Sequence, residues 1–249
     1  MHDSNKYYEL SKFAKTFNYG NILEEVKDYF GYIHDKDEMD DIALKLQICM
    51  KSSKPMYLHG YVISSALYKY LSDHSGLDDI VILETGTARG FSSVVMASVM
   101  NLKNMNGTIY TTDHNDRFDN CLKASQLKRK ITLEECVEEW KDLVQKYITF
   151  KKGDSNKILN SLDTSLSRIH FAFLDGAHFY DYLKKELDFV ASKQQVGDVI
   201  VCDDYTEKQF PGICKAIDEF LKKGNYEHRV FYGDDGTKKR GYVYMRRLH

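Results

Sequence analysis

The chain has 249 residues, 43% of them hydrophobic and 29% charged, which is typical of a folded globular protein and excludes a largely disordered one. Its 35 basic and 37 acidic residues leave a formal net charge of −2, so no strong field attracts nucleic acid or an anionic membrane. The five cysteines form no CxxC pair, which argues against a zinc site or a disulfide framework and suits a reducing cytoplasm. No stretch reaches the roughly 18 apolar residues of a membrane span. The expected partner is a small molecule.

Residues 1–77 show the apolar spacing of helices, as at Ile22, Val26 and Phe30, and no alternating β-branched run. A longer helical pattern begins at Gly60 and ends in polar stop signals before Gly76. We expect this segment to form a helical lid, which can also serve oligomerisation. His59 and Tyr61 beside the lid are candidates to reach a cofactor, although a surface histidine is the simpler interpretation of His59.

From residue 78 to residue 249, short apolar runs alternate with amphipathic stretches. Strands that alternate with helices predict a parallel sheet covered by helices on both faces, so this region is expected to be one α/β domain. The predicted strands are residues 80–83, 108–112, 148–151, 169–174 and 199–202, and the predicted helices are residues 92–102, 133–147, 180–192 and 212–222.

Two further strand-like runs, residues 227–232 and 241–246, flank a polar turn at residues 234–239 and should pair as an antiparallel hairpin. The complete expectation is a Rossmann-like, mostly parallel sheet of seven strands that ends in this hairpin. Such an ending is less typical of a dinucleotide-binding domain, in which parallel strands continue through helical crossovers.

The first strand runs into a glycine-rich turn, Glu84-Thr-Gly-Thr-Ala-Arg-Gly90, which opens a helix. Gly86 permits a tight turn, and the helix that begins after Gly90 offers free N–H groups to a carboxylate or phosphate. The turn is shorter than a GxGxxG motif, and an ordinary strand–helix connection is the alternative. The residues expected to contact a cofactor here are Glu84, Gly86, Thr87, Ala88, Gly90 and Ser92.

Two carboxylates at the ends of the next strands extend this cofactor site. Asp113 ends the second strand, where it can accept hydrogen bonds from both ribose hydroxyls of an adenosine, which NAD and S-adenosylmethionine share. Asp154 follows the third strand, where an adenine amino group can be met. A turn or helix-capping role is the alternative for each of them.

Asp175 closes the fourth predicted strand, and Asp203 and Asp204 close the fifth. In a parallel sheet these three carboxylates reach the same edge as the glycine turn, where their mutual repulsion favours a bound cation. Mg²⁺ is the expected ion because it prefers oxygen ligands and leaves positions for water or substrate hydroxyls. Capping of turns and helices is the structural alternative for Asp203 and Asp204.

The series from Glu84 to Gly90, Asp113, the run Phe173-Leu-Asp-Gly-Ala-His178 and the run Gly197–Tyr205 resembles the class I S-adenosylmethionine-dependent O-methyltransferases. Within them it is most similar to the macrocin/novobiocin type of sugar O-methyltransferase, the methyltransferase domain 24 type. The resemblance covers roughly residues 78–249. It implies S-adenosylmethionine as cofactor, Mg²⁺, and methyl transfer to a hydroxyl of a sugar or another polyhydroxylated small molecule.

Transfer of a methyl group to a hydroxyl requires removal of the hydroxyl proton. His178 is our candidate base, three residues after Asp175 and with an ordinary pKa that suits neutral pH, and Asp175 is the second candidate catalytic residue. The resembling sugar methyltransferases carry aspartate at the position of Ala177, and catechol-type relatives carry lysine at the position of His178. A histidine that only shapes the loop is the alternative.

Two other functions compete with methyl transfer. An NAD-dependent oxidoreductase commonly needs a Tyr-x-x-x-Lys pair, and Tyr180 and Lys184 have that spacing, but so do Tyr32 and Lys36 by chance. The short glycine turn also argues against this class. A non-catalytic nucleoside-binding protein is the third possibility, against which the acidic residues at all three strand ends argue.

Overall fold

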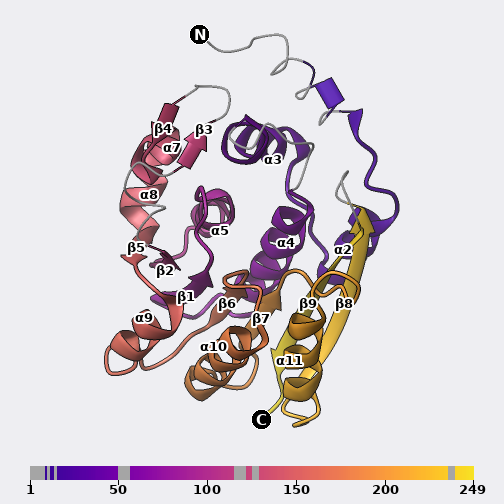
Figure 1. Cartoon of the computed structure of the whole chain (residues 1–249), viewed down its shortest axis with the longest axis vertical. Helices are drawn as coiled ribbons and strands as arrows, with labels where there is room; N and C mark the ends of the chain where they lie inside the picture. Colours follow the sequence, from indigo (N-terminus) through magenta and orange to yellow (C-terminus); the bar gives the residue numbers. More distant parts are fainter. Residues whose placement is uncertain are drawn as a thin grey trace.

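The computed structural model describes residues 9, 12–13, 16–49, 57–114, 122–124, 129–234 and 239–249. Seven strands form one sheet in the order β5-β2-β1-β6-β7-β9-β8 (Figure 1). Neighbouring strands are parallel, except that β9 runs antiparallel to both β7 and β8. The strands are β1 (Ile80–Thr85), β2 (Gly107–Asp113), β5 (Ile148–Lys152), β6 (Phe171–Leu174), β7 (Val199–Cys202), β8 (Tyr226–Asp234) and β9 (Lys239–Arg247).

This sheet confirms the predicted Rossmann-like fold with its terminal antiparallel hairpin. All seven predicted strands form, although β6 begins at Phe171, two residues later than expected. The tip of the predicted hairpin turn, residues 235–238, lies outside the described residues.

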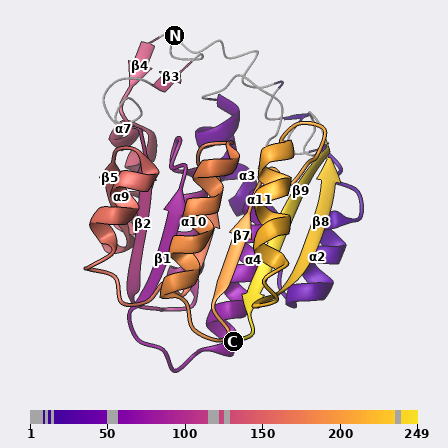
Figure 2. The ribbon, with the colours of Figure 1, turned by 60° about the horizontal axis from the view of Figure 1, so that its bottom comes forward.

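Helices cover both faces of the sheet, and Figures 1 and 2 show the two layers. Side chains of successive strand residues point to opposite faces, so Ile82 joins the hydrophobic cluster on one side and Leu83 the cluster on the other. One face carries α9 (Ser155–Leu162), α10 (Tyr180–Lys193) and α11 (Pro211–Leu221), and the other carries α2 (Ile22–Phe30), α4 (Leu58–Asp73), α5 (Phe91–Leu102) and α8 (Lys141–Tyr147).

The described part of residues 1–77 packs into the same core as the sheet. Val26 of α2 and Leu67 of α4 are fully buried in one cluster with Phe231 of β8. At the other end of α4, the Tyr70 hydroxyl donates to Asp198, 2.9 Å away, before β7. The boundary between residues 77 and 78 stays a prediction.

Three local features differ from the predicted elements. Helix α3 (Lys36–Ala43) continues into a π-helix, Leu44–Cys49, where the sequence predicts regular helix. The predicted helix at 133–147 is divided into α7 (Leu133–Val137), a 3₁₀ helix (Glu138–Trp140) and α8. Strands β3 (Leu122–Ala124) and β4 (Arg129–Ile131) form a separate, unpredicted hairpin.

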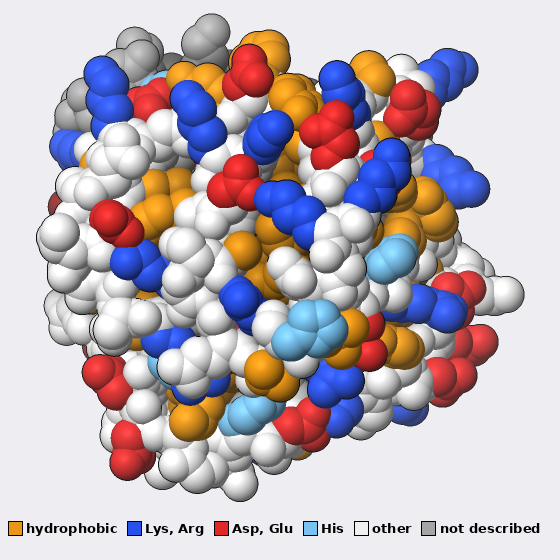
Figure 3. Space-filling view, turned by 90° about the horizontal axis from the view of Figure 1, so that it is seen from below, with side chains coloured by type: hydrophobic (Ala, Val, Ile, Leu, Met, Phe, Trp, Pro, Cys, Tyr) orange, Lys and Arg blue, Asp and Glu red, His pale blue; other side chains and the backbone are white. Residues whose placement is uncertain are grey.

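The surface agrees with the nearly balanced charge of the sequence. Figure 3 shows the face that carries α9, α10 and α11, where acidic and basic side chains lie interspersed. Among the described residues, no helix has both the length and the apolar character needed to cross a membrane.

Candidate active site

A cavity of about 640 Å³ opens at the carboxyl ends of the strands. It lies beside the point where the chain order of the sheet reverses, between β1 and β6, which is where open α/β sheets bind their ligands. Its volume suits a cofactor or a drug-sized molecule. Its wall consists of Gln47, His59, Gly86, Thr87, Ala88, Arg89, Phe91, Ser92, Thr112, Asp113, His114, Gly153, Ser155, Asp175, Gly176, Ala177, His178, Asp203, Asp204, Phe210 and Arg240.

The glycine turn forms the floor of one half of this cavity. Gly86 has φ +93°, and a Cβ atom there would lie 2.0 Å from the carbonyl oxygen of Asp175, so only glycine fits. Gly90, with φ +83°, is the N-cap of α5 and lets the helix begin directly beneath the cavity. The first N–H groups of α5 have no partner within the helix and are available to an anionic group.

Glu84 does not reach the cavity, contrary to its predicted contact with a cofactor. Its carboxylate is completely buried and accepts hydrogen bonds from the hydroxyls of Ser92 and Ser93 in the first turn of α5. Burial raises its pKa above the ordinary value. Glu84 therefore anchors the start of α5 to β1, and Ser92 lines the cavity while its hydroxyl donates to this carboxylate.

Asp113 lies at the cavity wall, as predicted, and it also holds the glycine turn in place. Its Oδ2 atom accepts the N–H of Ala88 at 2.7 Å, and its Oδ1 atom accepts the N–H of His114 at 2.7 Å. Ala88 has φ +47°, so this contact supports a backbone conformation that is uncommon for alanine. A carboxylate oxygen has two lone pairs, which leaves acceptor capacity for ribose hydroxyls.

Thr87 lines the same wall, and its hydroxyl lies 2.6 Å from that of Thr111 on β2. This side-chain contact joins the turn to the neighbouring strand. Together with the Gly86 N–H, which donates to the Thr112 carbonyl at 2.9 Å, it fixes the turn beside Asp113.

Asp154 is not among the residues that line the cavity, although its neighbours Gly153 and Ser155 are. Its side chain is the N-cap of α9, accepting the Lys157 N–H at 3.2 Å, and it also accepts the Tyr182 hydroxyl at 2.8 Å. The bond from Tyr182 lowers the pKa of Asp154. In the structure Asp154 therefore caps a helix, which was the alternative to its predicted contact with an adenine.

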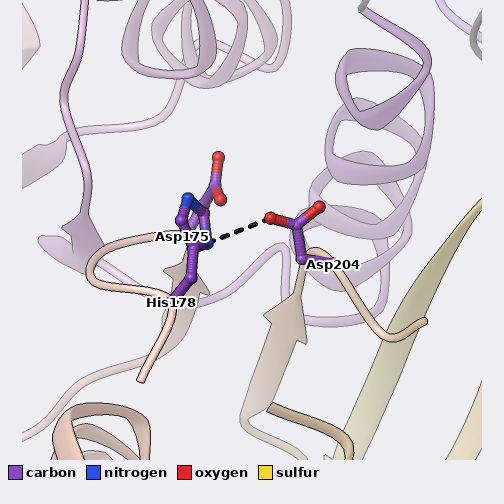
Figure 4. Close-up of side chains that lie close together, drawn as sticks. All are labelled: Asp175, His178 and Asp204. Atoms are coloured by element: carbon purple, nitrogen blue, oxygen red, sulfur yellow. Dashed lines mark ion pairs between the residues drawn. The ribbon is translucent and has the colours of Figure 1, made fainter. Parts of the chain in front are cut away.

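Asp175, His178 and Asp204 come together at the other half of the cavity (Figure 4). Each offers one ligand atom, and these atoms lie within 4.8 Å of one another. The Nδ1 atom of His178 lies 3.0 Å from Oδ2 of Asp204, and this hydrogen bond raises the pKa of the imidazole. His178 is half exposed toward the cavity, whereas Asp204 is buried.

Asp203 lies apart from this cluster, contrary to the predicted set of three carboxylate metal ligands. It is buried, its Oδ1 atom accepts the Asp204 N–H at 2.6 Å, and its Oδ2 atom lies 3.7 Å from Nη1 of Arg240. Burial, with Asp204 adding to it, raises the pKa of Asp203 to about 7. The expected metal set of Asp175, Asp203 and Asp204 is therefore not assembled.

Gln47 and Arg240 are among the residues of the wall that sequence reasoning missed. Arg240 contacts Asp204 through Nη1, and the signal for it was available, because a last strand antiparallel to β7 must begin where β7 ends. Gln47 lies in the π-helix, whose cavity-facing side no periodicity could identify. His59 also lines the cavity; it is buried against Phe173 and is not a surface residue.

Comparison with known proteins agrees with this geometry. A methyltransferase domain family matches residues 83–205, which span the glycine turn, Asp113 and the cluster around Asp175. The chain is an S-adenosylmethionine-dependent methyltransferase of class I. No match is found among curated proteins.

Several methyltransferases of known structure have the same fold as this chain, although their sequences are only distantly similar to it. The O-methyltransferase NovP is 17% identical, with a TM-score of 0.57 over 85% of this chain and 98% of NovP. TomG of Streptomyces achromogenes, solved with S-adenosylmethionine, is 15% identical, with a TM-score of 0.60 over 90% of this chain and 96% of TomG. CalS11, a TDP-rhamnose 3'-O-methyltransferase, is 18% identical, with a TM-score of 0.55 over 87% of this chain and 97% of its own.

Proposed function

We propose that this methyltransferase acts on a hydroxyl group of a sugar or another polyhydroxylated small molecule. The observation that carries the proposal is a single cavity that joins the glycine turn and Asp113 to the cluster of Asp175, His178 and Asp204. One half suits a nucleoside cofactor, and the other half holds a base beside carboxylates. Such a cavity can place an acceptor hydroxyl next to a methyl donor.

The cofactor half offers groups suited to each part of S-adenosylmethionine. Asp113 would accept hydrogen bonds from the ribose hydroxyls, and the N-terminus of α5 would bind the carboxylate. Gly86 lets the backbone of the Asp175 loop approach the turn, which brings the two halves of the cavity together. When bound, S-adenosylmethionine supplies a methyl group on a positively charged sulfur.

His178 is the proposed base. Because its Nδ1–H donates to Asp204, its Nε2 atom is left to accept a proton from the acceptor hydroxyl. With that donor bound, the acceptor oxygen would take the methyl group as His178 removes its proton, and the sulfur would keep the electron pair of the broken C–S bond. The proton ends on Nε2 of His178, where Asp204 stabilises the imidazolium, and then passes to solvent. Asp175 stays a predicted catalytic residue beside this base.

The polar residues of the wall support a hydroxyl-rich acceptor. Gln47 is buried, and among the described residues its Oε1 atom has no hydrogen-bond partner, so it can accept a hydrogen bond from a ligand hydroxyl. His59 adds a second polar group from the N-terminal segment. NovP and CalS11 are similar in fold, and the sugar nucleotide named for CalS11 makes nucleotide sugars the first acceptors to test.

The dehydrogenase alternative has weaker support in the geometry. Tyr180 and Lys184 are not among the residues of the cavity wall. The Tyr180 hydroxyl donates instead to Glu219 of α11 at 2.5 Å, on the face of the sheet that α10 and α11 cover. The pair therefore lies away from the position where a hydride would be transferred.

The test is calorimetric titration of S-adenosylhomocysteine and of NAD⁺ into the purified protein. We expect S-adenosylhomocysteine to bind, NAD⁺ to be silent, and the Asp113→Asn variant to bind at least about tenfold more weakly, since a lost charged hydrogen bond costs about 1.5–3 kcal/mol. Asp188→Asn, an exposed change on α10, is the matched control. Binding of NAD⁺ alone would refute the proposal.

A methyl-transfer assay then separates the acceptor classes. Nucleotide sugars, free sugars and catechols are incubated with S-adenosylmethionine, and S-adenosylhomocysteine production is measured. We expect turnover with at least one sugar-containing acceptor. Turnover with catechols alone, or methylation only at nitrogen, would refute the assignment of the acceptor while leaving the cofactor assignment intact.

A further inference from the structure

A guanidinium lies where sequence reasoning places a metal ion. Nη1 of Arg240 contacts Oδ1 of Asp204 and lies 3.7 Å from Oδ2 of Asp203. Its side chain is 13% exposed, so this charge is largely removed from water and faces the cavity. Arginine keeps its positive charge at every physiological pH.

The backbone of β9 holds Arg240 in this position. The next residue, Gly241, accepts the Tyr205 N–H on its carbonyl at 2.9 Å, which joins the start of β9 to the loop after β7. A Cβ atom on Gly241 would lie 2.2 Å from the Tyr205 carbonyl oxygen, so only glycine permits this approach. These contacts fix the backbone at the start of β9 next to the loop after β7, so the fold places Arg240 within reach of Asp204.

Three of the four carboxylate oxygens of Asp203 and Asp204 are already engaged by other groups of the protein. Asp204 uses Oδ1 for Arg240 and Oδ2 for His178, and Asp203 uses Oδ1 for a backbone N–H. Mg²⁺ requires near-octahedral oxygen ligands at about 2.1 Å and would have to displace the guanidinium or lie close to a like charge. The residues present do not fit the predicted Mg²⁺ site.

We propose that Arg240 takes the place of a divalent cation, so that this enzyme transfers its methyl group without a metal. Arg240 neutralises the paired carboxylates of Asp203 and Asp204, and Asp204 orients His178 as the base. The statement about methyl transfer without a metal rests on the proposed function. The statement that Arg240 excludes a cation from these carboxylates can be tested by a binding measurement that needs no turnover.

The experiment is titration of Mn²⁺ into the full-length protein, with bound ion measured by electron paramagnetic resonance. We expect the wild-type protein to bind Mn²⁺ only weakly and Arg240→Gln to bind at least about tenfold more tightly, because removing the guanidinium leaves two carboxylates in need of a cation. The matched control is Arg246→Gln on the same strand, where the arginine pairs with Glu227 at the surface. The double variant Arg240→Gln/Asp204→Asn should lose the gain.

Tight Mn²⁺ binding by the wild-type protein that Asp204→Asn abolishes would overturn the proposal, and this result does not require the Arg240 variant to fold. Unchanged Mn²⁺ affinity in a folded Arg240→Gln variant would overturn it as well. A second readout is methyl transfer in the presence of EDTA, which should keep the full rate of the untreated enzyme. Failure to bind S-adenosylhomocysteine would refute the proposed function and leave the Mn²⁺ result interpretable.

Discussion

The Nδ1 atom of His178 lies 3.0 Å from Oδ2 of Asp204. The two residues come from loops after adjacent strands, β6 and β7, so the sheet itself sets their separation. Asp204 has φ +61°, a left-handed conformation uncommon outside glycine, asparagine and aspartate. Backbone strain of this kind is concentrated at functional sites.

Replacing His178 tests whether it is the base. We expect His178→Gln to lower kcat by roughly 10²- to 10⁴-fold, the usual contribution of a positioned general base. The affinity for S-adenosylhomocysteine should stay within about twofold, since the imidazole acts on the acceptor. His228→Gln, an exposed histidine of β8, is the control. A kcat within threefold of wild type would remove His178 from the mechanism.

Replacing Gly86 tests the close approach at the glycine turn. Gly86→Ala places a Cβ atom 2.0 Å from the Asp175 carbonyl oxygen and forces alanine to φ +93°. We expect a loss of at least about 2 kcal/mol in the free energy of unfolding and at least tenfold weaker binding of S-adenosylhomocysteine.

The matched control for this change is Gly76→Ala, because no atom lies within 4 Å of the Cβ position at Gly76. Urea denaturation and calorimetry measure both quantities. Equal stability and affinity in the two variants would show that the turn tolerates a side chain.

Gln47 is expected to lower the stability of the ligand-free protein and to improve binding of the acceptor. Its buried Oε1 atom has no partner among the described residues, and a buried acceptor without a hydrogen bond costs about 1–3 kcal/mol. We expect Gln47→Leu to raise the thermal midpoint of the ligand-free protein while it raises the KM for the acceptor about tenfold. A lower midpoint with an unchanged KM would mean that Gln47 supports the core instead.

Glu186 predicts a pH-dependent stability. It is buried on α10, accepts the hydroxyls of Thr85 and Ser155 at 3.0 and 2.7 Å, and burial raises its pKa to about 7. Between about pH 5 and pH 7 the folded state holds this proton while the unfolded state releases it. The contribution of Glu186 to the free energy of unfolding should therefore fall by roughly 1.4 kcal/mol per pH unit as the pH rises through that window.

Urea denaturation at pH 5, 6, 7 and 8 measures this slope. Glu186→Gln should remove the component that Glu186 adds, leaving a variant more stable than wild type at pH 8. Glu24→Gln, an exposed change on α2, should keep the wild-type slope. Parallel slopes for wild type and Glu186→Gln would show that Glu186 does not titrate in this range.

The strands were predictable because each buried strand is a short apolar run, and Val199–Cys202 has the same bounds in sequence and structure. The edge of the sheet that carries the site followed from the same pattern, since Asp113 ends β2, Asp175 directly follows β6 and Asp204 lies two residues after β7. Local residue patterns therefore placed the carboxylates at the cavity.

The partners of those carboxylates were not predictable in the same way. Glu84 begins the glycine-rich turn in the sequence, yet its side chain is buried beneath the turn, because the alternation of β1 directs it to Ser92. Asp204 meets Arg240 across 36 residues of sequence, a contact that depends on how the hairpin folds back. The π-helix that carries Gln47 has no distinct apolar period, so its geometry arises only from packing.

The position of β9 in the sheet has a consequence for biosynthesis. This strand is made last of the seven, yet it lies inside the sheet between β7 and β8. Until it emerges from the ribosome, the edge of β7 is open and prone to pair with other chains, and the acidic loop after β7 lacks its arginine. The nascent chain therefore acquires its complete sheet and the charge balance of the site in one step, when β9 is added.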